Sequence, residues 1–232
     1  MQRSIVLLLA ATCGSAASAS AADPEIDRKA GSACASATLK PTGGVGFTSF
    51  GSDRNVAIPT LFSWKGGTPT ATATRTACGV FTNGKDHADG FALTVALPPQ
   101  TREVIVFVGS YKSAGWLNAT LLAEGGAVLG SRDKLIPQEV KANGVGNAAL
   151  SIRWAASADA APASLLVTWT VASGDNLQFA AVAIRSTAAA GPCATPMCAA
   201  VTTCAGNCPT VELDAVGDLD WMHAGVVSAY FL

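Results

Sequence analysis

The residues best suited to chemistry are gathered near the C-terminal end of the 232-residue sequence, in "VGDLDWMHAG", residues 216–225. A carboxylate beside an imidazole is a pairing that both general acid–base catalysis and metal binding use. No nucleophile or third orienting group is marked nearby, so the stretch does not complete a catalytic set. The four residues concerned are Asp218, Asp220, Trp221 and His223.

A structural role is the favoured interpretation of this stretch. Side chains alternate between the two faces of a strand, so the two aspartates share one face while Trp221 and His223 share the other. The two rings would then pack at the edge of a sandwich. The carboxylates would cap turns or hold a cation, either Arg28 or Lys29.

A second polar cluster, "NGKDHADG" at residues 83–90, has the residue types of a metal site. Asp86 and Asp89 could hold Ca²⁺ through their oxygen atoms, with His87 between them. The loop lacks the six or so oxygen ligands that Ca²⁺ takes, and it does not match a Ca²⁺-loop pattern. A solvated polar turn is therefore favoured over a metal site.

Catalytic motifs are missing from the sequence. It has two histidines, far apart, and neither a G-x-S-x-G elbow nor a Gly-rich loop before a helix. We therefore expect no enzyme activity and no cofactor.

A third group, in "GSYKSAGW" at residues 109–116, suits binding better than catalysis. Tyr111 and Trp116 in a loop between two strands could form a flat platform for sugar rings, beside Lys112. A polar neighbour, Asn118, could bond hydroxyl groups, and loop positions carry function more often than core positions do. In the alternative interpretation, Trp116 turns inward at the start of a core strand.

The first 21 residues have the features of an export signal. Arg3 precedes an apolar core, and Ala19-Ser20-Ala21 forms a small-x-small cleavage site. The sequence thus predicts a secreted, periplasmic or cell-surface protein. A lipid anchor at Cys13 is an alternative form of the same targeting segment.

Six cysteines follow the signal, and an even number in an exported chain indicates disulfide bonds. We expect the two isolated cysteines to pair with each other and the four clustered ones to pair among themselves. A zinc site is the competing interpretation of the cluster, although its C-x4-C-x5-C-x3-C spacing lacks the usual C-x2-C. The isolated cysteines are Cys34 and Cys78, and the clustered ones are Cys193, Cys198, Cys204 and Cys208.

The overall composition argues against two classes of partner. The net charge is −1, and no Lys/Arg cluster offers the electrostatic footprint of a nucleic-acid binder. No apolar run is long enough to form a transmembrane helix.

The elements that must position these residues are strands. Period-2 alternation dominates from about residue 60, with Gly/Pro turns between short runs, which predicts an all-β, antiparallel β-sandwich of jelly-roll or Ig-like type. A hairpin is expected with its turn at residues 173–176. Its buried row would be Leu165, Val167, Trp169 and Val171, answered by Leu177, Phe179, Ala181 and Ala183.

The predicted organisation has four parts. A disulfide-looped Cys/Ala/Pro linker follows the sandwich, and strand-like alternation resumes after it, so a C-terminal strand could complete the sheet. The parts are residues 1–21 (signal), 22–185 (sandwich), 186–209 (linker) and 210–232 (C-terminal strand segment).

Five short motifs occur in the order found in a β-sandwich module of large secreted bacterial proteins. That module typically opens with Gly-x-x-Asp-Trp-x-His-Trp-Gly and continues with Asn-Arg-Lys-Ala, and residues 27–185 resemble it. The resemblance implies a sandwich fold and no settled activity. The matching pieces are Asp27–Ala30, Ser63-Trp64, Gly67–Thr70, Val106–Gly109 and Leu166–Thr170.

The module's first strand is displaced in this sequence. Residues 217–225 match it, with Ala224 in place of the usual Trp, but they follow the last strand instead of preceding the first; Asp27 likewise replaces the usual Asn. The segment could fold back within its own chain, complete the sheet of a neighbouring copy, or be the stump of a second repeat. We favour fold-back, because intramolecular pairing costs less entropy than association.

Two functional hypotheses follow from the sequence. The first is a non-catalytic secreted or cell-surface module that binds carbohydrate or a cell-envelope polymer through the aromatic loop. The second is a structural or assembly subunit that self-associates by exchanging its C-terminal strand.

Overall fold

The computed structural model describes residues 26–29, 37–50, 60–136, 145–154, 162–186, 197–204 and 210–224. These residues form seventeen strands and one short helix. The prediction of an all-β antiparallel sandwich is confirmed, since all strand pairings but one among them are antiparallel. No helix of the described part is long and apolar enough to span a membrane.

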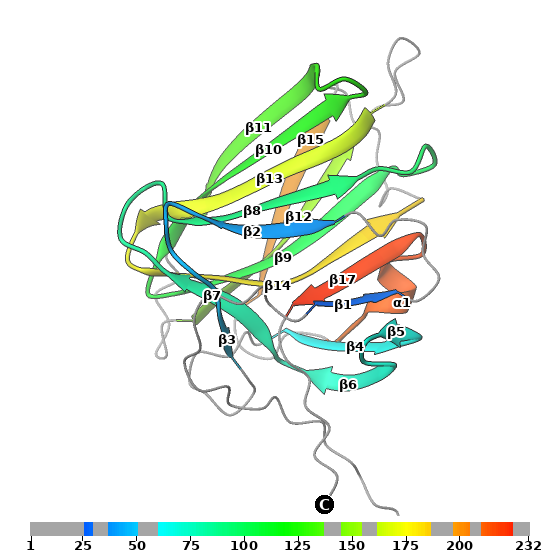
Figure 1. The fold of residues 1–232 in the computed structure, drawn as a ribbon, viewed down its shortest axis with the longest axis horizontal. Helices are drawn as coiled ribbons and strands as arrows, with labels where there is room; N and C mark the ends of the chain where they lie inside the picture. Colours follow the sequence, from blue (N-terminus) through cyan, green and yellow to red (C-terminus); the bar gives the residue numbers. More distant parts are fainter. Residues whose placement is uncertain are drawn as a thin grey trace, which may run out of the picture.

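A five-stranded sheet forms one layer, with the spatial order β11-β10-β13-β8-β2 (Figure 1). Its strands follow the predicted alternation, because one face is buried and the other is not. They are β2 (Thr38–Thr42), β8 (Gly90–Ala96), β10 (Ala114–Ala123), β11 (Val128–Ile136) and β13 (Pro162–Ser173).

A nine-stranded sheet forms the second layer, with the main order β15-β12-β9-β14-β17-β1-β5. β7 pairs with one half of the β14 edge and β17 with the other half, and β3 pairs with β7. Its strands are β1 (Ile26–Lys29), β3 (Thr48–Phe50), β5 (Gly67–Thr68), β7 (Gly79–Asn83), β9 (Glu103–Tyr111), β12 (Val145–Trp154), β14 (Asn176–Arg185), β15 (Met197–Cys204) and β17 (Asp220–Ala224).

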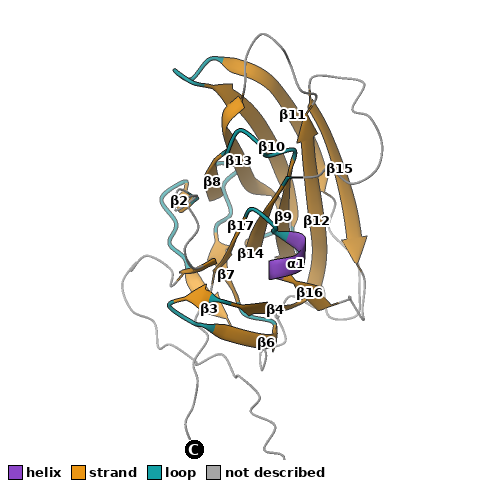
Figure 2. Ribbon diagram, turned by 90° about the vertical axis from the view of Figure 1, so that its right-hand side faces the viewer, coloured by secondary structure: helices purple, strands orange, loops and turns teal. Residues whose placement is uncertain are grey.

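A three-stranded sheet and the helix α1 (Leu213–Val216) cover part of the outer face of the nine-stranded sheet (Figures 1 and 2). The sequence predicts strand-like alternation through this segment, but only three residues extend before the chain turns into α1. The strands are β4 (Leu61–Lys65), β6 (Thr72–Thr76) and β16 (Thr210–Glu212).

Two hydrophobic cores result from this layering. The larger lies between the five- and nine-stranded sheets and contains Trp169, as predicted, together with Trp154. The smaller lies between the nine-stranded sheet and the three-stranded sheet with α1, and contains Phe62, Trp64 and Trp221. Because β14 is covered on both sides, its residues from Asn176 to Ile184 are all buried.

The predicted hairpin at residues 173–176 is wrong. β13 lies in the five-stranded sheet and β14 in the nine-stranded sheet, so the turn crosses between layers and the two strands do not pair. The turn is held by a side chain from the turn between β9 and β10. Ser113 Oγ accepts hydrogen bonds from the amides of Asp175 (3.0 Å) and Asn176 (2.9 Å). Gly174, at φ +84°, packs so closely on Ser113 that a Cβ would lie 2.4 Å from that oxygen.

All four residues of the predicted row of β14 are buried, but only Leu177 and Phe179 face the larger core. The register against β9 shifts between Phe179 and Ala181, which inserts one extra residue. Beyond the shift, Val182 and Ile184 continue the larger core, whereas Ala181 and Ala183 face the smaller one. Because the side-chain period is two, one added residue is enough to exchange the faces.

Part of the predicted linker is a strand. Residues 197–204 form β15, which pairs with β12 at the edge of the nine-stranded sheet. Cys78 is buried and disulfide-bonded. Cys34, Cys193 and Cys208, and the side chains of Cys198 and Cys204, lie outside the described residues, so the pairings and the disulfide-looped linker stay predictions.

Candidate functional site

The C-terminal strand β17 lies inside the nine-stranded sheet, between β14 and β1 and antiparallel to both. The register places His223 beside Ala181 of β14 and beside Asp27 of β1. Within this chain, therefore, the displaced segment folds back and completes the sheet. Strand exchange between copies stays a prediction.

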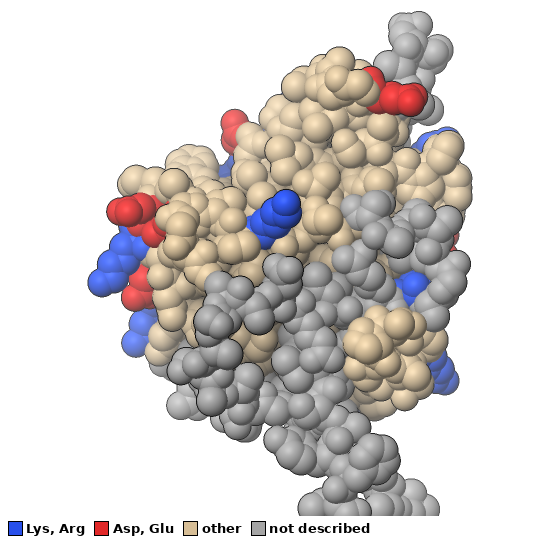
Figure 3. Space-filling view, viewed as in Figure 1, with Lys and Arg blue, Asp and Glu red and all other residues tan. Residues whose placement is uncertain are grey.

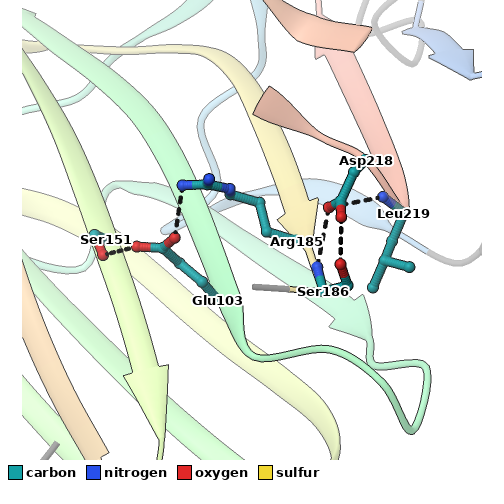
Figure 4. Close-up of polar contacts among 6 residues, drawn as sticks. All are labelled: Glu103, Ser151, Arg185, Ser186, Asp218 and Leu219. Carbon is teal, nitrogen blue, oxygen red and sulfur yellow. Dashed lines mark hydrogen bonds and ion pairs between the residues drawn. The ribbon is translucent and has the colours of Figure 1, made fainter. Parts of the chain in front are cut away.

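Asp218 caps the turn that leads into β17. Its carboxylate accepts hydrogen bonds from the amide (2.9 Å) and the hydroxyl of Ser186, and from the amide of Leu219 (3.1 Å) (Figure 4). Partial burial raises the pKa of this carboxyl, but the Ser186 and Leu219 hydrogen bonds and the Arg185 charge outweigh it, so its pKa lies below the ordinary value. These contacts fasten the turn to the end of β14.

Lys29 binds the same turn through its backbone and not through a carboxylate. Its Nζ donates to the carbonyl oxygens of Gly217 (3.2 Å) and Asp218 (2.8 Å). Lys29 thus contacts this segment as predicted, but its ammonium group binds backbone carbonyl oxygens and not a carboxylate. The side chains of Arg28 and Asp220 lie outside the described residues, although both backbones pair in the sheet.

Trp221 and His223 lie on one face of β17, as the alternation predicts, and both are buried. The His223 ring stacks 4.8 Å from the Trp64 ring and 5.4 Å from the Phe62 ring, measured between centroids. Neither ring nitrogen forms a hydrogen bond of ordinary geometry with the described residues. Burial lowers the pKa of His223 to about 3, with the backbone of Cys78 partly opposing the effect. The imidazole is a neutral core ring.

Asp214 forms hydrogen bonds with this segment that the sequence did not reveal. Its two carboxylate oxygens accept from Trp221 Nε1 (3.1 Å) and from the amide of Lys65 (2.5 Å). It was expected on the polar side of a strand, whereas it lies in α1. The described polar side chains of the segment that looked most suited to chemistry thus contact other residues of the same chain.

The loop at residues 83–90 is closed on itself. Asp89 is buried, and its carboxylate accepts from the amide of Asp86 (2.9 Å). His87 Nδ1 lies 3.0 Å from the carbonyl oxygen of Val171. In the described part of the chain, no three side chains of metal-ligating type are grouped so as to hold an ion. The contacts are those of a polar turn that joins two sheets.

Tyr111 and Lys112 lie at this same end of the sandwich, where the turn from β9 to β10 also crosses between layers. Lys112 has a positive φ of 50°, and its Nζ lies 5.1 Å from the centre of the Tyr111 ring. A cation at that distance interacts favourably with the ring face. The Lys112 ammonium group therefore covers one face of the Tyr111 ring.

Trp116 lies on the opposite face of the molecule from Tyr111, so the predicted two-ring platform is wrong. Leu117 pairs with Trp169, which is in the larger core, and its neighbour Trp116 therefore points outward from the five-stranded sheet. Tyr111 shares a register position with Asn176 in the nine-stranded sheet, next to the inward pair Ser110 and Leu177. The alternative in which Trp116 turns inward is also wrong, since the residue is 47% exposed.

Trp116 stands on a flat, polar surface made by the outward side chains of the five-stranded sheet. We call it the Trp116 surface. Figure 3 views this side of the molecule and shows mostly uncharged atoms across it, with one basic side chain near the middle of the view and the other charged side chains toward its edges. From edge to edge its members are Ser131 and Asp133; Trp116, Asn118 and Thr120; Leu166, Thr168 and Thr170; Ala92 and Thr94; and Thr38, Lys40 and Thr42.

Hydrogen bonding divides the Trp116 surface into two halves. On the β11 side, Asn118 donates to Asp133, and Thr120 donates to the Asn118 side-chain oxygen (2.9 Å). On the β13 side, the half-buried hydroxyls of Thr168 and Thr170 form no hydrogen bond with any described residue. Hydroxyl groups that can both donate and accept are therefore free directly beside the exposed ring.

A buried ion pair lies away from this surface, at the start of β9. Glu103 is 1% exposed and accepts from Arg185 (3.0 Å) and from Ser151 (2.5 Å) (Figure 4). Arg185 precedes the residue that Asp218 caps, so the two networks adjoin along the chain. Sequence inspection missed this pair because its members lie 82 residues apart.

Comparisons with known proteins add little to this picture. No family model matches the chain, and no curated protein matches it. One similar solved structure is the enzymatically active domain of bacteriophage CBA120 tailspike protein 4, at 15% identity and a TM-score of 0.36. The match covers 62% of this chain and 18% of that one, so this chain spans a small part of the tailspike domain's length.

Proposed function

We propose that this protein is a non-catalytic carbohydrate-binding module, exported to the periplasm, the cell surface or the medium, and that the Trp116 surface is its binding site. One observation carries the proposal. Of the five tryptophans, Trp64, Trp154, Trp169 and Trp221 are at most 5% exposed, whereas Trp116 is 47% exposed on a flat face with free hydroxyls beside it.

The chemistry of the surface suits a sugar. The π face of an exposed tryptophan ring can pack on the apolar face of a sugar ring. Threonine hydroxyls beside the ring can exchange hydrogen bonds with sugar hydroxyls. A sheet holds these groups at fixed positions, so little conformational entropy is lost when a ligand binds.

The proposal differs from the sequence-based hypothesis in its residues. Trp116 and Asn118 remain, whereas Tyr111 and Lys112 lie on another face and contact each other. Export rests on the signal-like N-terminal segment, which lies outside the described residues.

Affinity electrophoresis through gels that contain a polysaccharide tests the proposal. We expect the wild-type protein to be retarded by at least one polymer among mixed-linkage β-glucan, glucomannan, xylan, dextran, alginate and polygalacturonate. Trp116→Ala should weaken that binding at least tenfold, because loss of a central tryptophan commonly costs about 2 kcal/mol. Trp116→Tyr should retain most of it, since a stacking ring remains.

Tyr111→Ala separates the two possible sites. Binding through the Trp116 surface leaves the affinity of this variant within twofold of the wild type. A loss with Tyr111→Ala and none with Trp116→Ala would place the site at the end of the sandwich and refute the proposal. Absence of retardation by every polymer in the panel would also count against it.

A further inference from the structure

The rows of the Trp116 surface define a path on which a ligand chain can lie. The register aligns Trp116 with Thr170 of β13, Gly90 of β8 and Thr42 of β2, in one line across the strands. The next line, about 7 Å along the strands, runs from Asn118 through Thr168 and Ala92 to Lys40.

The two directions away from Trp116 differ in what they offer a ligand. Toward β11, Asn118 and Asp133 already bond each other. Toward β13, the hydroxyls of Thr168 and Thr170 are unbonded among the described residues. Hydrogen-bonding capacity for a ligand is therefore concentrated on the β13 side of the ring.

Beyond β13, the outward residue of β8 in the row of Asn118 and Thr168 is Ala92, which is half-buried and carries a single methyl group. A ligand chain that passes over Thr168 meets no bulky side chain at this position.

Two charged side chains of the Trp116 surface lie at opposite edges of the sheet. Asp133 lies on β11, one row from Trp116, and accepts a hydrogen bond from Asn118, whereas Lys40 lies on β2 in the row of Ala92. A chain that runs from Trp116 toward β8 therefore leads away from the carboxylate and toward the ammonium group.

Resting on the proposed function, we infer that the ligand is a polysaccharide whose chain runs across the strands, from Trp116 over Thr168 and Thr170 to Ala92 of β8. The direction across the strands, and not along β10, is the specific content of the inference.

Matched substitutions within β8 test the path. Isoleucine at position 92 places a bulky side chain on the path, whereas isoleucine at position 96, on the same face about 13 Å further along the strand, does not. Both positions are half-buried alanines in a strand, where a β-branched residue is well tolerated. Equal melting temperatures of Ala92→Ile and Ala96→Ile would show that the comparison is fair.

We expect Ala92→Ile to lose at least tenfold in affinity for the retarding polymer and Ala96→Ile less than twofold. Thr168→Val with Thr170→Val should lose about tenfold or more, as two neutral hydrogen bonds are removed.

The outcomes separate this inference from the proposed function. Loss of binding in Trp116→Ala with full binding in Ala92→Ile would keep the site and overturn the path. Equal losses in Ala92→Ile and Ala96→Ile would overturn the path as well. Full binding by Trp116→Ala would overturn both proposals.

Discussion

The segment at residues 216–224 and the Trp116 surface use similar residue types in opposite ways. Each has a tryptophan with a carboxylate nearby and further polar groups around it. In the C-terminal segment, Trp221 is 1% exposed and Asp214 accepts its ring N–H. On the five-stranded sheet, Trp116 is 47% exposed and lies beside unbonded hydroxyls.

The difference shows that residue type alone does not identify a site. Every described polar side chain of the C-terminal segment is either bonded within the chain or, like His223, buried among aromatic rings. Capacity to interact with a ligand remains where the fold leaves polar groups unbonded and an aromatic ring exposed. That condition holds at the Trp116 surface.

Removal of residues 210–232 should have the largest effect on stability. It deletes β16, α1 and β17, and with them Leu213, Trp221, Met222 and Ala224, which are at most 2% exposed. Burial of each large apolar side chain contributes about 1.5–3 kcal/mol, and a whole domain has about 5–15 kcal/mol. We expect the chain ending at Pro209 to lose cooperative melting or to melt more than about 15 °C lower.

The mass of the full-length protein, measured over a concentration series, serves as the control for this truncation. A constant monomer mass agrees with fold-back of β17 within its own chain. A mass that rises with concentration and falls on truncation would show strand exchange, and would favour the assembly hypothesis.

The same substitution at the two tryptophans gives the sharpest contrast. Trp221→Ala should destabilise the protein by about 3–5 kcal/mol, because it leaves a cavity beside Trp64 and an unpaired Asp214. Trp116→Ala should change stability by less than about 0.5 kcal/mol, as an exposed position does. Urea unfolding measures both, and similar losses in the two variants would contradict the comparison.

Acid should weaken the buried segment through His223. Its pKa is about 3 in the folded protein against an ordinary value of 6.5, so the unfolded chain binds the proton first as the pH falls. The contribution of the neutral ring is complete above pH 6.5 and is lost progressively down to about pH 3, on the order of a few kcal/mol.

His223→Phe should remove this dependence between pH 6.5 and pH 5, where most carboxylates are still ionised. Melting temperatures across that range measure it, with His87→Gln as the matched control because His87 is exposed. An unchanged slope in His223→Phe would show that the ring is solvated in the folded protein.

Asp218→Asn should have the smallest effect. The variant keeps one acceptor oxygen for Ser186 but loses the charge, and the residue is exposed, so we expect at most about 1 kcal/mol. The pKa of Asp218 is lowered in the folded state, so its contribution is present above the ordinary pKa and lost below it. The difference in melting temperature between Asp218→Asn and the wild type should therefore shrink as the pH falls below about 4; a constant difference would argue against a role for the charge.

The sequence was sufficient for the fold class and for most of the buried rows. Alternation in β13 identified Leu165, Val167, Trp169 and Val171 as core, because local period and burial agree there. It could not show that the turn at residues 173–176 crosses between sheets. That outcome depends on Ser113, sixty residues earlier, which supplies the hydrogen-bond acceptor for the turn.

The candidate site was predictable only in part. "GSYKSAGW" drew attention to Trp116 and Asn118, but the turn within it joins two layers, so Tyr111 and Trp116 end on opposite faces. No sequence pattern singled out Thr168 and Thr170, which occur only within the Leu166–Thr170 motif. Their importance arises from the register with β10, which a single sequence does not contain.

Quenching of tryptophan fluorescence by iodide, with and without the retarding polysaccharide, tests the central claim most directly. Four of the five tryptophans are at most 5% exposed, so the quenchable signal belongs to Trp116. We predict that the polysaccharide abolishes most of the quenching and that Trp116→Tyr has almost no quenchable tryptophan signal to protect. Binding of the polysaccharide with unchanged quenching would place the ligand elsewhere and contradict the account.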